Sequence, residues 1–216
     1  MNLQICEIFY SVQGEASFSG QPCVFVRFTG CNLRCVWCDT TYAFSGGEAM
    51  TVDEIVARVK SYGCRLVELT GGEPMLQAEG ACSLMSRLLA EGMTVLLETN
   101  GACALDLVPQ GVHRIIDLKA PGSGTAHRED IWNGYAGSWR DTDEVKCVVS
   151  GRSDFDWCME KLKHYKAVGR VIIHFAPVWG AVEPSDLVEW ICASHEPVRL
   201  SLQIHKVSWD PEARGV

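Results

Sequence analysis

The sequence predicts an α/β fold: a single-domain, partial (open) β/α TIM-like barrel of about six parallel strands. Two observations lead to this prediction. Short runs rich in Val, Ile and Leu recur along the 216 residues, and segments with helical periodicity separate them. The runs are apolar on both faces, as strands covered by helices should be. The sequence contains no internal repeat and no long linker, so we expect one domain over residues 1–216.

Strands are expected wherever such a run lies between turn residues. A first strand near Leu3–Tyr10 leads into a loop that contains glycine. Seven further runs predict the parallel strands of the barrel: Cys23–Thr29, Leu66–Thr70, Thr94–Glu98, Arg114–Leu118, Glu144–Val149, Arg170–Phe175 and Val198–Gln203.

Four helices are expected between these strands. The first follows a capping-box pattern at Thr51 and Glu54, the third begins at Ser153 or Asp154, and the fourth begins at Pro184. Apolar side chains that repeat at helical spacing are interpreted as core: Val52, Ile55, Val56 and Val59; Leu84, Met85, Leu88 and Leu89; Phe155, Cys158, Met159 and Leu162; Leu187, Val188 and Ile191.

The least regular stretch runs from Ala120 to Asp143. It is rich in Gly and also holds two Trp and one Tyr. Two interpretations stay open for it: a substrate lid, or a long surface loop.

Composition and charge exclude several classes of protein. No basic segment followed by an apolar core opens the chain, and no run reaches the roughly 18 apolar residues of a membrane helix, so we expect a cytoplasmic protein and no membrane partner. The formal net charge is −8 at pH 7, without any run of Lys and Arg. Nucleic-acid binding usually needs a basic patch to neutralise phosphates. We therefore expect a small-molecule substrate and no nucleic acid.

A cysteine motif is the strongest functional signal. Cys31, Cys35 and Cys38 have the spacing C-x3-C-x2-C and directly follow an expected strand. Three thiolates on one tight loop can bind three irons of a [4Fe–4S] cluster and leave the fourth iron open to a chelate. The amino and carboxylate groups of S-adenosylmethionine (SAM) form such a chelate. The motif therefore predicts a radical SAM enzyme.

A structural zinc site is the main alternative for these cysteines. Structural zinc takes four ligands, usually as two separated pairs. The sequence has no second C-x2-C or H-x3-H pair, and the next histidine is His113. The odd count of eleven Cys, with no export signal, makes a disulfide framework unexpected. The other eight are expected to be small buried side chains.

Polar sequences follow several of the expected strands. In parallel β/α barrels, catalytic groups gather where the strands end. The sequences at these ends are Gly71-Gly72-Glu73-Pro74, Glu98-Thr99-Asn100-Gly101, Asp117-Leu118-Lys119 and His174-Phe175-Ala176-Pro177. We expect them to share one mouth with the cysteine loop, where the Gly-Gly backbone and the Glu73 carboxylate are expected to bind an ammonium group.

With these motifs in hand, the chain resembles the 7-carboxy-7-deazaguanine synthases, radical SAM lyases of queuosine (tRNA modification) and 7-deazapurine biosynthesis. The resemblance runs along nearly the whole chain. It rests on Ser11-Val12-Gln13-Gly14-Glu15, Arg27-Phe28-Thr29-Gly30-Cys31-Asn32-Leu33, Cys38-Asp39-Thr40, Thr70-Gly71-Gly72-Glu73-Pro74, Asp117-Leu118-Lys119 and Leu202-Gln203-Ile204-His205-Lys206. One departure is Ala16, where the family loop commonly has Gly.

The resemblance implies conversion of 6-carboxy-5,6,7,8-tetrahydropterin to 7-carboxy-7-deazaguanine with loss of ammonia. SAM would act catalytically, Mg²⁺ would assist, and hydrogen abstraction from C6 would start a ring contraction. The family also implies a homodimer, and an electron donor such as flavodoxin is expected. The alternative is a glycyl-radical-enzyme activase that acts on a protein, which would need no small-molecule clamp such as Arg27.

The resemblance also assigns roles to positions of this chain. The cluster ligands would be Cys31, Cys35 and Cys38, and Thr40 would bind Mg²⁺. SAM would be bound by Trp37, Cys38, Asp39, Gly72, Glu73, Asp117, Leu118, Lys119 and Pro177. The pterin would be bound by Val12, Gln13, Gly14, Glu15, Arg27, Thr70, His205 and the C-terminal Val216.

Overall fold

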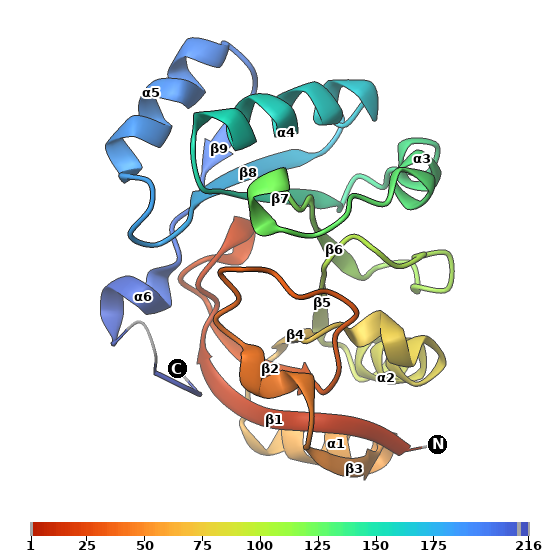
Figure 1. The fold of residues 1–216 in the computed structure, drawn as a ribbon. Coiled ribbons are helices and arrows are strands. Elements are labelled where there is room, and N and C mark those ends of the chain that lie inside the picture. Colours follow the sequence, from red (N-terminus) through yellow and green to blue (C-terminus); the bar gives the residue numbers. More distant parts are fainter. Residues whose placement is uncertain (1, 211–212, 216) are drawn as a thin grey trace.

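The computed structural model describes residues 2–210 and 213–215. A single curved sheet has the strand order β3-β1-β2-β4-β5-β6-β7-β8-β9 and is open between its two edges (Figure 1). Its strands are β1 (Asn2–Val12), β2 (Pro22–Phe28), β3 (Glu48–Thr51), β4 (Leu66–Gly71), β5 (Thr94–Thr99), β6 (His113–Asp117), β7 (Glu144–Val149), β8 (Ile172–Pro177) and β9 (Val198–Leu200). The predicted open β/α barrel is confirmed.

The parallel part of the sheet runs from β2 to β9 and has seven strands in the described residues, one for each of the seven runs named from the sequence. β1 and β3 are antiparallel additions at one edge. The last strand ends at Leu200 rather than at Gln203. β3 was not predicted, because it is a short edge strand whose first two residues are exposed.

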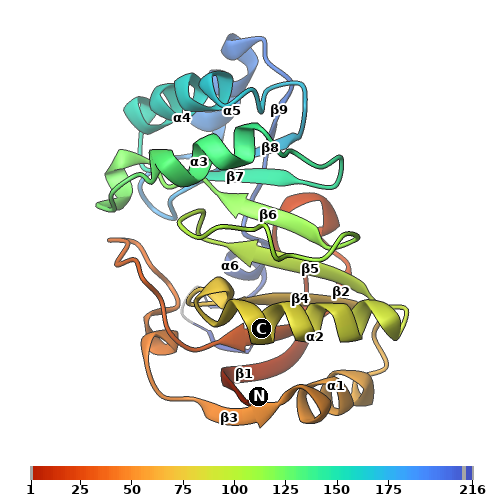
Figure 2. The same ribbon diagram turned by 90° about the vertical axis from the view of Figure 1, so that its right-hand side faces the viewer.

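The helices are α1 (Val52–Ser61), α2 (Ala78–Ala90), α3 (Glu129–Ala136), α4 (Arg152–His164), α5 (Pro184–Ser194) and α6 (Ile204–Ser208). Figure 2 looks onto α2, α3 and α4, which lie in front of the strands on the outer side of the sheet. The predicted capping box is present: the Glu54 amide donates to the Thr51 hydroxyl at 3.3 Å, and the Thr51 amide donates to the Glu54 carboxylate at 2.7 Å. No helix among the described residues is long and apolar enough to cross a membrane.

The irregular stretch from Ala120 to Asp143 is not a plain surface loop. It contains α3, whose Trp132 and Tyr135 pack into the core together with Trp139. The indole of Trp139 donates to the carbonyl oxygen of Tyr165 at 2.9 Å. Burial of three aromatic side chains, each worth roughly 1.5–3 kcal/mol, fixes this segment on the outer wall of the barrel.

Two details of the predicted core are wrong. Val188 of α5 is 41% exposed, and only Leu187 of its apolar stripe is buried. Of the eight cysteines outside the motif, only three are buried, namely Cys23, Cys147 and Cys158. No two of the eleven cysteines are joined by a disulfide bond.

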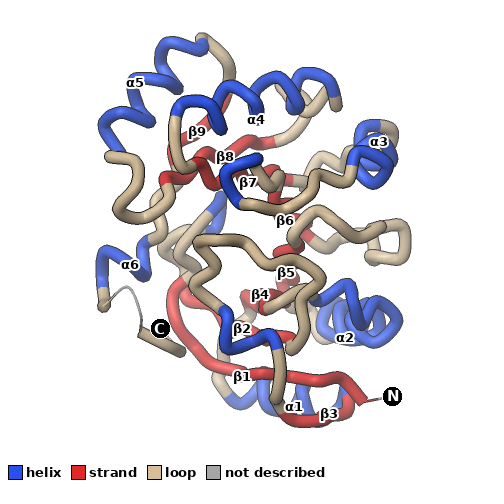
Figure 3. The backbone as a smooth tube through the Cα atoms, viewed as in Figure 1, coloured by secondary structure: helices blue, strands red, loops and turns tan. Residues whose placement is uncertain are grey.

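The inner face of the sheet is more polar than the sequence pattern predicts. On β7, Val145, Cys147 and Val149 join the apolar core under the helices. Side chains of a strand alternate between its faces, so Lys146 and Val148 point to the opposite, inner side. β4 repeats this pattern, with Val67 and Leu69 in the core. The long loop between β2 and β3 crosses in front of this inner face (Figure 3).

Candidate active site

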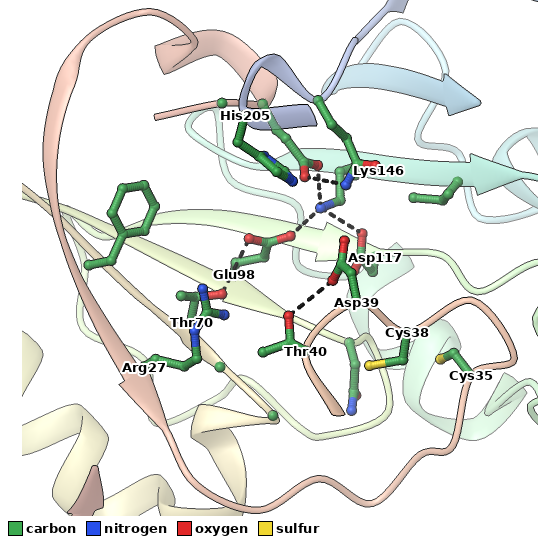
Figure 4. A pocket seen from close by; sticks show the side chains of 18 of the residues that line it. Arg27, Cys35, Cys38, Asp39, Thr40, Thr70, Glu98, Asp117, Lys146 and His205 are labelled. Atoms are coloured by element: carbon green, nitrogen blue, oxygen red, sulfur yellow. Dashed lines mark hydrogen bonds and ion pairs between the residues drawn. The ribbon is translucent and has the colours of Figure 1, made fainter. Parts of the chain in front are cut away.

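One cavity of about 510 Å³ occupies the inner face and the ends of the parallel strands. Most of the predicted site residues line it. They are Val12, Gln13, Gly14, Glu15, Arg27, Cys31, Cys35, Trp37, Cys38, Asp39, Thr40, Thr70, Gly72, Asp117, Lys119 and His205. Figure 4 shows Cys35 and Cys38 at one end, Arg27 and Thr70 at the other, and charged side chains between them.

Three predicted SAM residues do not line the cavity. Leu118 is 1% exposed and belongs to the apolar core. Pro177 ends β8, and the next residues, Val178 and Trp179, line the cavity instead. Glu73 is fully buried. Val216, the predicted C-terminal substrate contact, lies outside the described residues.

The Glu73 carboxylate points away from the cavity and fastens its loop to β5. It accepts hydrogen bonds from the amides of Asn100 at 2.7 Å and Met75 at 2.9 Å, and from the hydroxyl of Thr99 at 2.9 Å. Burial raises the pKa of Glu73. The expectation that this carboxylate binds an ammonium group therefore has no support in the geometry, and only the glycine backbone of the loop faces the cavity.

The cysteine loop supplies the donor set of an iron–sulfur cluster, three thiols on one short segment. Its three thiols line the same cavity. The sulfur of Cys31 accepts the amide of Leu33 at 3.4 Å and the side-chain amide of Asn100 at 3.8 Å. Donors of this kind stabilise a thiolate, which is the form that binds iron. The amide of Val36 donates to the carbonyl oxygen of Ser123 at 3.0 Å and ties the loop to the barrel.

The Gly71-Gly72 loop touches the cysteine loop through backbone atoms. The amide of Gly72 donates to the carbonyl oxygen of Phe28 at 3.1 Å, and that of Glu73 to the carbonyl oxygen of Gly30 at 2.7 Å. A Cβ atom on Gly72 would lie 2.0 Å from this Gly30 oxygen. Glycine is required here because the two loops approach too closely for any side chain.

Gly72→Ala is therefore expected to push the two loops apart. We expect unfolding at a lower urea concentration, with a loss of about 1–3 kcal/mol, and less iron per chain after anaerobic reconstitution. Gly134→Ala is the matched control, because a Cβ on Gly134 meets no atom within 4 Å. That variant should keep its iron and its stability; equal iron in both variants would contradict the role given to Gly72.

Lys146 is the centre of the charged side chains. Its side chain is 5% exposed, and its ammonium group pairs with Glu15 at 2.7 Å, with Asp117 at 3.5 Å, and with Glu98 (Figure 4). Burial alone would lower the pKa of Lys146, but the nearby Asp117, Glu15 and Glu98 carboxylates raise it well above its ordinary value. Lys146 therefore stays charged and links the carboxylates of three separate segments.

Glu15 and Asp117 are each held by a second partner. Burial would raise the pKa of Glu15, yet the Lys146 ammonium and a 2.9 Å hydrogen bond from Gln203 lower it. Asp117 also accepts the ammonium of Lys119 at 2.6 Å. Both carboxylates are thus fixed in position before any ligand binds.

Arg27 is rigidly mounted at the other end of the cavity. Its Nε donates to Glu7 at 2.7 Å, and Glu7 also accepts the hydroxyl of Tyr42 at 2.8 Å. The guanidinium carbon lies 5.7 Å from the ring centroid of Phe9 and 5.9 Å from that of Tyr42. A guanidinium group that is fixed in this way presents a planar fork suited to a carboxylate.

The C-terminal helix α6 closes one side of the site. The amide of Ile204 donates to the carbonyl oxygen of Gly14 at 3.0 Å. Lys206 pairs with Asp39 at 2.8 Å, and this ammonium outweighs burial and lowers the pKa of Asp39 to about 2. Burial lowers the pKa of His205, which favours a neutral imidazole there.

Thr40 has the chemistry of a Mg²⁺ ligand. Its hydroxyl lines the cavity and donates to Asp39 at 3.0 Å. A hydroxyl that donates in this way keeps its lone pairs for a hard cation such as Mg²⁺.

The prediction from sequence missed several residues of the site. Lys146, Glu68, Gln203 and Lys206 line the cavity but were given no role, and Glu98 was named only as part of a strand end. For Lys146 a signal exists in the sequence: it is the sole basic residue within the otherwise mostly apolar run Glu144–Val149.

The open parallel barrel and the loop of three cysteines define a radical SAM enzyme. The Radical SAM superfamily model matches residues 25–118, which contain that loop. Enzymes of this class carry a [4Fe–4S] cluster and SAM, and these are the cofactors of this chain.

Closer relatives identify the family. The 7-carboxy-7-deazaguanine synthase of Chlorobaculum tepidum is 46% identical over 215 residues, covering 99% of this chain and 97% of the relative. That of Koribacter versatilis is 42% identical over 228 residues, covering 99% and 100%. The chain belongs to the family of 7-carboxy-7-deazaguanine synthases. The crystal structure of QueE from Escherichia coli has a TM-score of 0.73, 22% identity and 94% coverage of each chain, and this likeness shows the shared fold.

Proposed function

We propose that this chain converts 6-carboxy-5,6,7,8-tetrahydropterin to 7-carboxy-7-deazaguanine with loss of ammonia. The main support is the composition of one cavity, which has the cysteine loop at one end and Arg27, held in place by Glu7, at the other. Two ligands can lie there side by side, as hydrogen transfer between them requires. When bound, the cluster and SAM supply the radical that abstracts a hydrogen atom from the substrate.

The residues of the cavity divide between the two ligands. Trp37, Gly72 and Lys119 lie with the cysteine loop and would hold SAM. At the other end, the Arg27 fork would bind the substrate carboxylate and the ionised Glu15 would accept from the guanidine-like edge of the pterin. Thr40 would hold Mg²⁺ through its hydroxyl oxygen.

Arg27→Lys tests the carboxylate clamp. Lysine keeps the charge but loses the planar fork and its stacking between Phe9 and Tyr42. We expect the KM for the pterin to rise by about 10-fold or more, as for a lost charge-assisted hydrogen bond, while SAM cleavage without the pterin stays unchanged. A KM equal to that of the wild type would exclude Arg27 as the clamp.

The function as a whole is tested by mass spectrometry. The anaerobically reconstituted protein is incubated with SAM, dithionite, Mg²⁺ and the pterin. We expect 7-carboxy-7-deazaguanine as product. Cleavage of SAM without this product would keep the radical SAM class and refute the proposed substrate.

Partners and location are further parts of the proposal. Val36, in the cysteine loop, is 73% exposed, which supports docking of an electron donor such as flavodoxin next to the cluster. Tyr10 and Trp209 are exposed apolar residues that line a shallow groove, which supports a homodimer. The cytoplasm is the proposed location, since a reductant of this kind is found there.

A further inference from the structure

Glu68 of β4 is a buried carboxyl group that none of the roles above uses. It lines the floor of the cavity, is 1% exposed, and accepts a hydrogen bond from the side-chain amide of Gln13 at 2.6 Å. Glu98 lies on the same inner face of the neighbouring strand β5: the register pairs Glu68 with Leu96, two residues before Glu98, and both carboxyl groups line the cavity. Two carboxyl groups can share a hydrogen bond only if one of them carries a proton.

The proton is assigned to Glu68 because Glu98, and not Glu68, forms an ion pair with the Lys146 ammonium group. Glu98 pairs directly with the Lys146 ammonium. The ion pairs of Lys146 within 4 Å go to Glu15, Glu98 and Asp117, and none of them goes to Glu68.

The other groups around Glu68 add no charge that would ionise it. Gln13 is neutral, and burial raises the pKa of the Cys23 thiol on β2. Burial and the adjacent Glu98 also raise the pKa of Glu68 well above its ordinary value, against the weaker effects of Gln13 and Lys146.

A protonated Glu68 would connect two substrate-facing parts of the site. Its hydroxyl would donate to Glu98, and its other oxygen accepts the side-chain amide of Gln13. The other end of the Gln13 amide accepts the backbone amide of Glu15. Gln13 is 2% exposed and both ends of its side chain are bonded, so it braces the loop that carries Glu15.

We propose that Glu68 is a positioning residue that stays protonated in the working enzyme. It keeps Glu98 and the Gln13–Glu15 loop in fixed positions next to the pterin. This inference rests on the proposed function for the identity of the ligand. The protonation of Glu68 itself can be measured without any turnover.

Two substitutions separate this role from general packing. Glu68→Gln keeps both hydrogen bonds, because its carbonyl oxygen accepts from Gln13 and its amide donates to Glu98. Glu68→Leu has a similar size but leaves Gln13 without an acceptor and Glu98 without a donor. We expect the KM for the pterin to stay within about threefold in Glu68→Gln and to rise about tenfold or more in Glu68→Leu. SAM cleavage without the pterin reports whether each variant is folded and loaded.

Two measurements need no pterin. In the wild-type minus Glu68→Gln infrared difference spectrum, the carboxylic acid band of Glu68 should appear, while bands of other buried carboxyl groups such as Glu73 cancel. Glu144→Gln is the matched control: Glu144 is also buried, and its 2.6 Å pair with His174 lowers its pKa despite burial. Glu144→Gln should therefore lower Tm by about 5 °C or more, whereas Glu68→Gln should leave Tm nearly unchanged.

The outcomes distinguish the inference from the proposed function. A wild-type enzyme that makes no deazaguanine refutes the function and leaves the infrared result valid. An active wild type whose Glu68→Gln variant is as impaired as Glu68→Leu overturns the inference. The same holds if the wild-type minus Glu68→Gln difference spectrum contains no carboxylic acid band.

Discussion

Cys35→Ala is expected to remove the [4Fe–4S] cluster and reduce SAM cleavage by at least about 100-fold, since even the loss of a residue that only supports a metal ligand costs about 10–100-fold. The thiols of Cys31 and Cys38 would then hold only two of the three protein-bound irons. Iron per chain, the visible absorbance of the reconstituted protein and the rate of 5′-deoxyadenosine formation measure the effect.

Cys192→Ala is the control for thiol chemistry in general. Cys192 is an exposed free thiol in α5, away from the cavity. We expect this variant to bind iron and cleave SAM like the wild type. A cluster that survives in Cys35→Ala, or disappears in Cys192→Ala, would contradict the assignment of the ligands.

Lys146→Met is expected to lower the free energy of unfolding by about 3–5 kcal/mol, as for a buried ion pair that loses one partner. Without the ammonium, Glu15, Glu98 and Asp117 would be left close together in a buried site. Urea denaturation measures the loss. Turnover should fall as well, because these carboxylates would lose the cation that holds them in position.

Lys60→Met is the matched control for the loss of a lysine ion pair. Lys60 pairs with Glu91 at 2.6 Å, but its side chain is 52% exposed. Exposed pairs of this kind contribute about 0–1 kcal/mol. An equal loss of stability in the two variants would show that the carboxylates around Lys146 do not depend on its charge.

The barrel could be predicted because its strands and outer helices carry strong local patterns. The run Glu144–Val149 and the capping box at Thr51 are found where the sequence places them. β3 escaped prediction because it depends on a distant partner: its four residues pair with Asn2–Ile5 at the edge of the sheet. α3 was hidden by Gly134 within it and Gly137 at its end, although Trp132 and Tyr135 have helical spacing.

The residues of the site could be predicted in part. The cysteine spacing and Arg27 pointed to the cavity that the structure contains. The direction in which a side chain points depends on contacts between segments that are distant in sequence. This is why the orientation of Glu73 was not predicted: its carboxylate accepts the backbone amide of Asn100 instead of facing the cavity. Lys146 was missed for the same reason, because its three carboxylate partners come from separate parts of the chain.

The most direct measurement follows a hydrogen atom from one ligand to the other. The reconstituted enzyme is supplied with SAM, dithionite, Mg²⁺ and 6-carboxy-5,6,7,8-tetrahydropterin that carries deuterium at C6. We predict 7-carboxy-7-deazaguanine as product, with deuterium recovered at the 5′ carbon of SAM or of 5′-deoxyadenosine. Cleavage of SAM with all the deuterium still on an unchanged pterin would contradict the claim that this cavity brings the two together for reaction.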